Sequence, residues 1–302
     1  MQENKCCQLC PRECRINRSA GEKGFCGCDD KLYVARAALH MWEEPCISGE
    51  EGSGTVFFSG CTLRCVFCQN ECIANCSLGK EVTVERLVEI FMELQDKGAN
   101  NINLVTPTHY TLHIIKALKA AKKRGLLIPV VYNTSGYEKV ETLKLLEGLV
   151  DIYLPDLKYF SKELSKRYSH AENYFECASK AIEEMYRQVG TPQFDETTGM
   201  MKKGIIIRHL VLPGGVEDSK KVVEYLYNTY GDNIYMSIMS QYTPMPALCE
   251  SGKYPELSVK LSEKEYDEVV DYAIDLGVEN AFIQEGETAS ESFIPDFNCE
   301  GV

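Results

Sequence analysis

The sequence predicts an α/β fold, in which a partial (βα)6-type barrel follows a small cysteine-rich N-terminal extension. Two observations predict the barrel. Apolar segments of strand length alternate with amphipathic segments of helix length from about residue 55 onward. The strand segments are also apolar almost throughout, as parallel strands are when both faces of the sheet are covered. Residues 1–50 instead are rich in cysteine, glycine and charge, so we expect a module over 1–50 and a barrel over 51–302.

The first strand and helix show the pattern. The apolar run TVFFSG at 55–60 predicts a buried strand, and apolar residues at helical spacing predict a helix over 83–97. Further strands are expected at 101–107, 128–136, 150–158, 205–214, 234–242 and 281–284. Further helices are expected at 109–124, 138–147, 161–189, 217–229 and 262–276. Because ligands bind at the carboxyl ends of parallel strands, the polar residues that follow these strands should converge on one rim.

Charge and hydropathy argue against several classes of protein. The 302-residue chain has a net charge of −13, whereas contacts with nucleic-acid phosphates need clustered Lys and Arg. It contains no run of about 18 apolar residues, so we expect no transmembrane helix. The first residues lack the apolar stretch of a secretory signal. These features predict a cytoplasmic protein that binds neither nucleic acid nor membrane.

The 15 cysteines are unevenly distributed: six lie in the first 28 residues and five between Cys61 and Cys76. A disulfide framework would be spread more widely, so the clustering favours two local thiolate sites for metal or redox chemistry. The isolated cysteines are expected to be small buried hydrophobic residues. They are Cys46, Cys177, Cys249 and Cys299.

The segment SGCTLRCVFCQN at 59–70 follows the first expected strand and has the spacing C-x3-C-x2-C. Three thiolates on one tight loop can each take one iron of a [4Fe–4S] cluster, which leaves the fourth iron open to a chelating cofactor. A zinc site completed by Cys72 or Cys76, or a set of buried free thiols, is the alternative. The position of the loop at the head of a βα series favours the cluster. Its ligands would be Cys61, Cys65 and Cys68.

The loop CTLRCVFC, with the aromatic Phe67 before its last cysteine, resembles the signature loop of the radical S-adenosylmethionine (SAM) superfamily. The resemblance implies that SAM binds the open iron through its amino and carboxylate groups. It also implies that an electron from the reduced cluster cleaves SAM to a 5′-deoxyadenosyl radical, which abstracts hydrogen from a substrate. The protein would mainly orient the reactants and exclude water.

The resemblance makes the polar residues at the strand ends candidates for the SAM site. Asn133 and Ser135 would suit ribose hydroxyls, and Arg208 would hold the SAM carboxylate. At Thr106 and Thr108 the sequence departs from the Gly- and Glu-containing turn of the family. Ordinary turn chemistry is the alternative for Asn133 and Ser135, a solvated pair on the rim for Asp156 and Lys158, and a structural ion pair for Arg208. The SAM candidates are Phe67, Thr106, Thr108, Asn133, Ser135, Asp156, Lys158, Arg208 and Gln241.

A closer likeness is to the pyruvate formate-lyase activating enzymes, and nearer still to an activating-enzyme-like branch with an N-terminal cysteine module. It spans roughly residues 7–290 and is carried by CQLCPREC, GTVFFSGC, NINLVTPTHY, VYNTSGYE, IYLPDLKY and RHLVLPGG. In the true activases, SAM chemistry abstracts hydrogen from a glycine of a partner enzyme. The likeness therefore implies an oxidoreductase with a glycyl-radical enzyme as protein substrate and a flavodoxin or ferredoxin as electron donor.

A second metal site is expected in the N-terminal extension, where four cysteines follow the pattern C-x2-C-x3-C-x11-C. They are Cys7, Cys10, Cys14 and Cys26. Four thiolates can close a structural zinc site or hold an auxiliary Fe–S cluster. A module this short buries little core, so metal would supply part of its folding free energy. Zinc, a cluster and no metal stay open, and Cys6 and Cys28 are alternative ligands.

Two other functions fit parts of the pattern. A radical SAM enzyme could modify a small molecule or another peptide, and a small metabolite would need a closed pocket instead of an open groove. A non-catalytic zinc-binding interaction module would hold metal in both cysteine clusters but bind no SAM. The polar strand ends argue against such a module, because a scaffold has no need for them on one rim.

Overall fold

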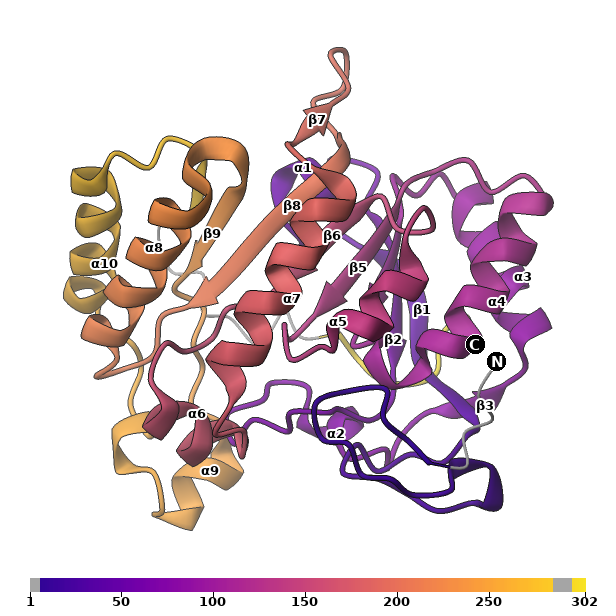
Figure 1. Cartoon of the computed structure of the whole chain (residues 1–302), viewed down its shortest axis with the longest axis horizontal. Coiled ribbons are helices and arrows are strands. Elements are labelled where there is room, and N and C mark those ends of the chain that lie inside the picture. The colour runs from indigo at the N-terminus through magenta and orange to yellow at the C-terminus, as the bar shows by residue number, and fades with distance from the viewer. Residues whose placement is uncertain (1–5, 285–294) are drawn as a thin grey trace.

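The computed structural model describes residues 6–284 and 295–302, which form one curved sheet with helices on its outer face (Figure 1). The strand order is β10-β9-β8-β6-β5-β4-β2-β1-β3. Every pair from β2 to β10 along this path is parallel, and β1 pairs antiparallel with both β2 and β3. The strands are β1 Leu32–His40, β2 Ser53–Phe58, β3 Lys80–Val82, β4 Ile102–Val105, β5 Val130–Thr134, β6 Ile152–Pro155, β8 Met201–Leu210, β9 Tyr235–Met239 and β10 Ala281–Ile283, and β7 Gln193–Phe194 pairs with β8.

Most helices connect successive parallel strands. They are α3 Val84–Asp96, α4 Thr111–Lys123, the short α5 Val140–Leu143, α6 Lys162–Ser169, α7 Tyr174–Val189, α8 Val216–Tyr230 and α10 Glu263–Leu276. Other short helices are α1 Pro45–Ser48, α2 Glu71–Ala74 and α9 Pro246–Ser251, and 3-10 turns lie at Arg18–Ala20, Thr108–Tyr110, Lys144–Leu146, Gly231–Asn233 and Pro255–Leu257. Helix α3 begins at Thr83, whose side chain accepts the N–H of Arg86 and so satisfies one free donor of the first turn. Within the described residues, every helix is too short or too polar to cross a membrane.

The structure confirms the predicted α/β class with its parallel-dominated sheet, and all seven expected strands are present. The helix expected over 161–189 is divided at His170, whose φ of 54° ends α6 in the left-handed region. Strand β1 was not expected, and it lies inside the range 1–50 although it belongs to the sheet. The boundary near residue 50 stays a prediction. Residues 285–290, at the end of the predicted family likeness, lie outside the described part.

The inner face of the sheet is apolar near the amino ends of the strands and polar one layer further along. Val131 and Ile206 form an apolar cluster with Ile47 of α1, which closes the end of the sheet opposite α2 and α6 (Figure 1). Side chains two residues apart on a strand share a face. Asn133 and Arg208 therefore stand directly above this apolar layer.

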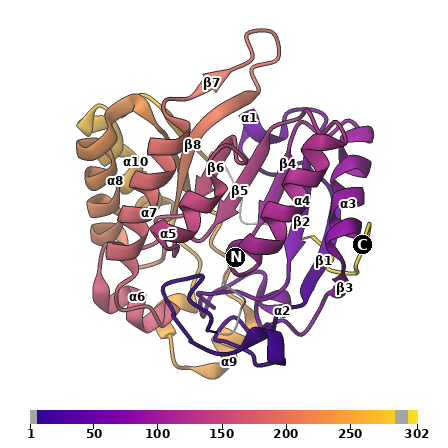
Figure 2. The same ribbon diagram turned by 45° about the vertical axis from the view of Figure 1, so that its right-hand side comes forward.

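The N-terminal segment crosses the carboxyl ends of the strands, beside α2 and α9 (Figure 2). Arg12 fixes it there. Its guanidinium donates to the backbone carbonyls of Thr62 at 2.8 Å and Ser169 at 2.9 Å, and also to that of His170. The same guanidinium stacks 3.9 Å from the ring centre of Phe25. One side chain thus ties the N-terminal segment to the cysteine loop and to the end of α6.

Candidate active site

The three cysteines of the C-x3-C-x2-C motif lie on one loop between β2 and α2, at the carboxyl edge of the sheet. The Sγ of Cys61 accepts the backbone N–H groups of Leu63 at 3.3 Å and Arg64 at 3.5 Å. The Sγ of Cys65 accepts the hydroxyl of Ser169 at 3.0 Å. Hydrogen bonds of this kind surround the sulfur ligands of Fe–S clusters and tune their reduction potential.

Two of the three thiols, Cys65 and Cys68, have raised pKa values to which the neighbouring cysteines contribute. Burial raises the pKa of Cys65 to about 11, Cys61 adds to the shift, and Lys158 opposes it. Burial also raises the pKa of Cys68, with smaller contributions from Cys65 and Cys61. Crowded, half-buried thiolates are stabilised by a bound cation. A cubane cluster takes each of them at a different iron, so this donor set fits a [4Fe–4S] cluster with one open iron.

Four of the predicted SAM residues meet in one polar network on the inner face. Arg208 Nε donates to Asp156 at 2.9 Å, and an Arg208 terminal nitrogen donates to the side-chain oxygen of Asn133 at 2.7 Å. Lys158 Nζ binds the other carboxylate oxygen of Asp156 at 2.6 Å. Burial alone would raise the pKa of Asp156, but Arg208 and Lys158 outweigh it and hold that pKa below its usual value. The network is therefore charged and preorganised.

Two further carboxylates, Glu43 and Glu44, enter this network from the segment before α1, and no pattern in the sequence predicted them. Glu43 accepts from Asn103 at 2.9 Å and lies 3.4 Å from Arg208. Burial raises the pKa of both Glu43 and Glu44, although Arg208 opposes the shift at each. These residues stand in a segment without hydrophobic periodicity, next to a proline, so no pattern placed them on the inner face of the sheet.

Phe67 and Gln241 lie on another side of the loop. The Phe67 ring is buried and packs edge-on against Tyr168, 6.5 Å away, and Tyr242, 6.1 Å away. Gln241 contributes its backbone carbonyl, which accepts the side-chain amide of Gln69 at 3.0 Å. These contacts connect the cysteine loop to the segment after β9.

The remaining candidates face other partners. Thr106 adopts a φ of 59°, and its N–H binds the carbonyl of Asn133. The Thr108 hydroxyl donates to the buried carboxylate of Glu138 at 2.5 Å. At Ser135 the backbone carbonyl accepts the Tyr174 hydroxyl at 2.8 Å. The structure does not bring these three side chains into the Arg208 network, and their roles stay predictions.

Glu138 links the ends of β4 and β5 and is expected to make stability depend on pH. Its carboxylate accepts the hydroxyls of Thr108 and Thr134, each at 2.5 Å, and burial raises its pKa from 4.5 to about 7. The folded state therefore binds this proton more tightly than the unfolded state. The stabilisation that the protonated Glu138 carboxyl gives the folded state is fully present below pH 4.5 and is lost as the pH rises through 7. The loss amounts to about 3 kcal/mol, since each pKa unit is worth about 1.4 kcal/mol.

Urea unfolding of Glu138→Gln and of the unchanged chain at pH 5 and pH 8 tests this expectation. In Glu138→Gln, the free energy of unfolding should lose most of this decrease between pH 5 and pH 8. Glu141→Gln, at an exposed position of α5, is the matched control and should leave the dependence unchanged. Parallel curves for Glu138→Gln and the unchanged chain would show that Glu138 is ionised in the folded state throughout.

The N-terminal cysteines of the predicted second metal site lie near one another. Cys10 and Cys26 are buried, and Phe25 donates its N–H to the Sγ of Cys14 at 3.3 Å. Burial raises the pKa of Cys10, and both Cys26 and Cys7 add to the shift. Among the described residues, no three Cys, His or carboxylate side chains already converge on one metal-ion position. A metal at these cysteines stays a prediction.

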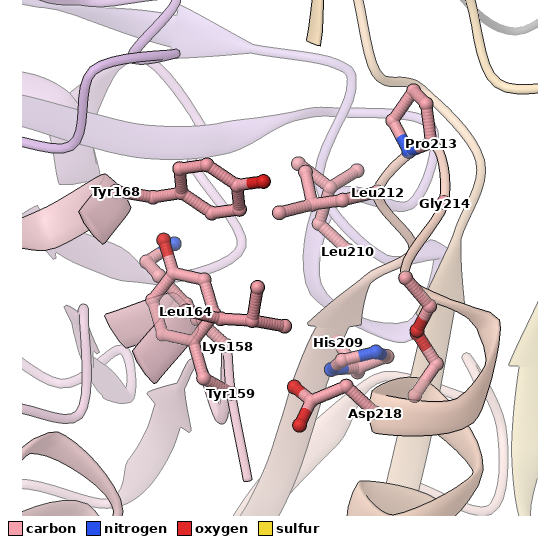
Figure 3. Close-up of a pocket in the computed structure, with 12 residues that line it drawn as sticks. Lys158, Tyr159, Leu164, Tyr168, His209, Leu210, Leu212, Pro213, Gly214 and Asp218 are labelled. Atoms are coloured by element: carbon pink, nitrogen blue, oxygen red, sulfur yellow. The ribbon is translucent and has the colours of Figure 1, made fainter. Parts of the chain in front are cut away.

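A small hollow opens beside the network, between α6 and the loop from β8 to α8 (Figure 3). Figure 3 shows Tyr168 and Leu164 on one side and His209, Leu212 and Asp218 on the other. Burial lowers the pKa of His209 to about 4, so the imidazole is neutral at pH 7. Its Nδ1 lies 2.7 Å from the carbonyl of Leu157, so Nε2 is left as a hydrogen-bond acceptor.

The sequence model of the radical SAM superfamily matches residues 55–227. The chain belongs to the radical SAM superfamily. It is 30% identical over 279 residues to the uncharacterized protein MJ0674 of Methanocaldococcus jannaschii, covering 89% of this chain and 74% of that protein. It is 27% identical over 203 residues to the pyruvate formate-lyase-activating enzyme of Clostridium pasteurianum, covering 62% of this chain and 80% of that enzyme.

Two solved structures show similarity at 15% identity. SuiB of Streptococcus suis bound to S-adenosylmethionine has a TM-score of 0.49 and covers 76% of this chain and 49% of its own. HydG, a maturase of the [FeFe]-hydrogenase, has a TM-score of 0.49 and covers 72% of this chain and 48% of its own. The chain thus spans about half the length of these two proteins.

Membership of the radical SAM superfamily implies a [4Fe–4S] cluster and SAM as cofactors. The matched range contains the cysteine loop and every SAM candidate except Gln241. The N-terminal cysteines lie before it. The family therefore supports cofactor binding at the carboxyl edge of the sheet and leaves the second metal open.

Proposed function

We propose that this radical SAM protein holds its [4Fe–4S] cluster on Cys61, Cys65 and Cys68 and activates a protein substrate. When bound at these thiols, the cluster would supply the electron for the reductive cleavage of SAM, and the resulting radical would abstract hydrogen from the substrate. The observation that carries the cofactor assignment is the placement of three cysteines on the one loop after β2, where the Sγ of Cys61 accepts the N–H of Leu63 and the Sγ of Cys65 accepts the hydroxyl of Ser169. No catalytic side chain is assigned.

The polar network supports a SAM site beside this loop. Lys158 acts electrostatically on both Asp156 and Cys65, so it lies between the carboxylate network and the thiols. A cation there would attract the SAM carboxylate, and Asp156 would orient Lys158 and Arg208. Phe67, held between Tyr168 and Tyr242, offers an aromatic ring on the loop itself, where it would pack on the adenine and exclude water.

Similarity to the pyruvate formate-lyase-activating enzyme supports a glycyl-radical enzyme as the substrate. That similarity covers 62% of this chain, and it does not identify the residues that would contact a partner protein. The proposal of a protein partner therefore needs its own test, separate from the test of SAM cleavage. A flavodoxin or ferredoxin is the proposed electron donor.

Anaerobic reconstitution with iron and sulfide, reduction in the presence of SAM, and chromatography for 5′-deoxyadenosine test the first part. Formation of 5′-deoxyadenosine is the expected result. Absence of this product, with zinc bound and no cluster absorption, would favour the zinc scaffold. A pyruvate formate-lyase is then added, and electron paramagnetic resonance should show a glycyl radical on it. SAM cleavage without that radical would contradict the activating role but not the radical SAM activity. It would favour a small molecule or another peptide as the substrate.

A further inference from the structure

Residues 295–302, which we call the edge segment, hydrogen-bond to β1 on the opposite side of the sheet from β10. Cys299 donates its N–H to the carbonyl of Ala35 at 3.0 Å, and Ala37 donates its N–H to the carbonyl of Glu300 at 2.8 Å. These bonds follow directly on the part of β1 that pairs with β3. In Figure 2 the end of the chain lies beside β1 and β3. The edge of β1 therefore binds the backbone of an extended segment.

Phe297 anchors the edge segment on the inner face of the sheet. Its ring packs edge-on against the buried ring of Phe57 in β2, with the ring centres 5.3 Å apart. The two residues that flank Phe57 in β2 pack in the main core under the helices, so Phe57 faces the inner side. Phe57 belongs to a small apolar cluster, which we call the aromatic seat. Its other members are Ala35, Ile73 and Val105.

Basic side chains flank the aromatic seat. Arg36 pairs with the carboxylate of Glu300 at 2.7 Å and donates to the backbone carbonyl of Asp296 at 2.8 Å. Arg86 of α3 donates to the carbonyl of Gly301 at 3.2 Å. The chain as a whole has a net charge of −13, so this basic edge attracts an acidic segment more strongly than most of the surface does. The surface fits an extended segment with an aromatic residue and an acidic residue three positions later.

The aromatic seat lies beside the proposed cluster loop. The carbonyl of Ile73 accepts the N–H of Gly60, the residue directly before Cys61, at 2.7 Å. Val105 pairs in register with Asn133 of the polar network, so the seat and the proposed SAM site belong to one layer of the sheet. A protein substrate that loses hydrogen at this site must bring a segment to the same edge of the sheet.

The edge segment has the features of a segment that can be exchanged. None of its residues is buried: 296, 298 and 300 are exposed, and the others are half-buried. Segments with few buried apolar contacts open at a much lower free energy than the core of a protein. A second segment with the same features can therefore take its place without unfolding the barrel.

We propose that the edge of β1 and the aromatic seat form the docking site for an extended, aromatic and acidic segment of the protein substrate. The edge segment occupies this site in the substrate-free chain. The inference rests on the proposed function, because only a protein substrate supplies such a segment. The substrate segment adds to β1, and its aromatic side chain takes the place of Phe297. The internal occupant weakens the apparent affinity for the substrate by the fraction of chains in which the site is open.

The first test measures the docking site without a partner protein. A fluorescein-labelled peptide with the sequence of residues 295–302 is titrated with a chain that ends at residue 294, and fluorescence anisotropy follows binding. We expect saturable binding that is about tenfold or more tighter than to the unchanged chain. A peptide with alanine in place of Phe297 should also bind about tenfold more weakly. Equal binding in all three titrations would overturn the docking site.

The second test uses pyruvate formate-lyase and chains that keep all residues. Phe297→Ala removes the anchor of the edge segment, so it should bind pyruvate formate-lyase several times more tightly than the unchanged chain does. Asn298→Ala, at an exposed position of the edge segment, is the matched control and should bind like the unchanged chain. The labelled peptide should be displaced from the truncated chain by pyruvate formate-lyase. Equal binding of this enzyme by Phe297→Ala and the unchanged chain, without displacement of the peptide, would overturn the proposal.

Failure of the docking site and failure of the proposed function give different results. The unchanged chain is assayed for 5′-deoxyadenosine in the same preparations, and absence of this product contradicts the radical SAM activity whatever the binding results are. Peptide binding without any binding of pyruvate formate-lyase contradicts the activating role, and with it a segment of that enzyme as the occupant. Binding of pyruvate formate-lyase that the edge segment does not affect contradicts the docking site alone.

Discussion

Replacement of Cys65 with alanine is expected to abolish 5′-deoxyadenosine formation completely. Cys65 is the central thiol of the loop: it interacts electrostatically with Cys61 and Cys68 and accepts the hydroxyl of Ser169 at 3.0 Å. Two remaining thiolates cannot hold a four-iron cluster that already lacks a fourth protein ligand. The measurement is chromatography of the reduced reaction with SAM, together with the visible absorption of the reconstituted protein.

Cys72→Ala provides the control for this experiment. Cys72 is exposed, and it lies four residues beyond the last cysteine of the motif. We expect the variant to retain the cluster absorption and the activity. SAM cleavage at the normal rate by Cys65→Ala would overturn the ligand assignment, and loss of the cluster in Cys72→Ala would show that the loop uses a fourth cysteine.

Replacement of Arg208 with methionine should lower the free energy of unfolding by about 3–5 kcal/mol, the usual cost of breaking a buried ion pair by removing one partner. Its guanidinium lies 2.9 Å from Asp156 and 3.4 Å from Glu43, and both carboxylates are buried. Without Arg208, Asp156 keeps its ion pair with Lys158, whereas Glu43 keeps no ion pair with any residue that the structure describes. Urea unfolding measures the stability, and anaerobic calorimetric titration of the reconstituted protein measures SAM affinity, which should also fall.

Two further variants make this result specific. Arg167→Met removes an exposed pair with Glu256 and should cost less than about 1 kcal/mol. Adding Glu43→Gln to Arg208→Met removes one uncompensated charge and should restore part of the lost stability. Equal stability of Arg208→Met and Arg167→Met would refute the buried network. Unchanged SAM affinity in a folded Arg208→Met variant would remove Arg208 from the SAM site.

The parallel strands were predictable because their signal is local. TVFFSG and NINLVTP are apolar runs that end in polar residues, and each became a buried parallel strand, β2 and β4. The meeting of Asn133, Asp156, Lys158 and Arg208 followed from the rule that carboxyl ends of parallel strands share an edge. Their role in binding SAM stays a prediction.

The contribution of the first 50 residues could not be predicted. Strand β1 is interrupted by Arg36 and ends at His40, so it lacks the continuous apolar run of the parallel strands. Glu43 contacts Arg208, which is 165 residues further along the sequence. A contact between residues so far apart produces no periodic pattern in the sequence.

The contacts of Arg12 have a consequence for synthesis on the ribosome. Ser169, whose carbonyl it binds, is 157 residues further along the chain. At roughly 5–20 residues per second, translation needs on the order of 10 s to produce that partner. The N-terminal thiols emerge first and stay undocked for this interval, so the nascent chain carries them unprotected until α6 has formed. Contacts of such high order also slow folding. Insertion of the cluster is therefore expected to follow release of most of the chain from the ribosomal exit tunnel.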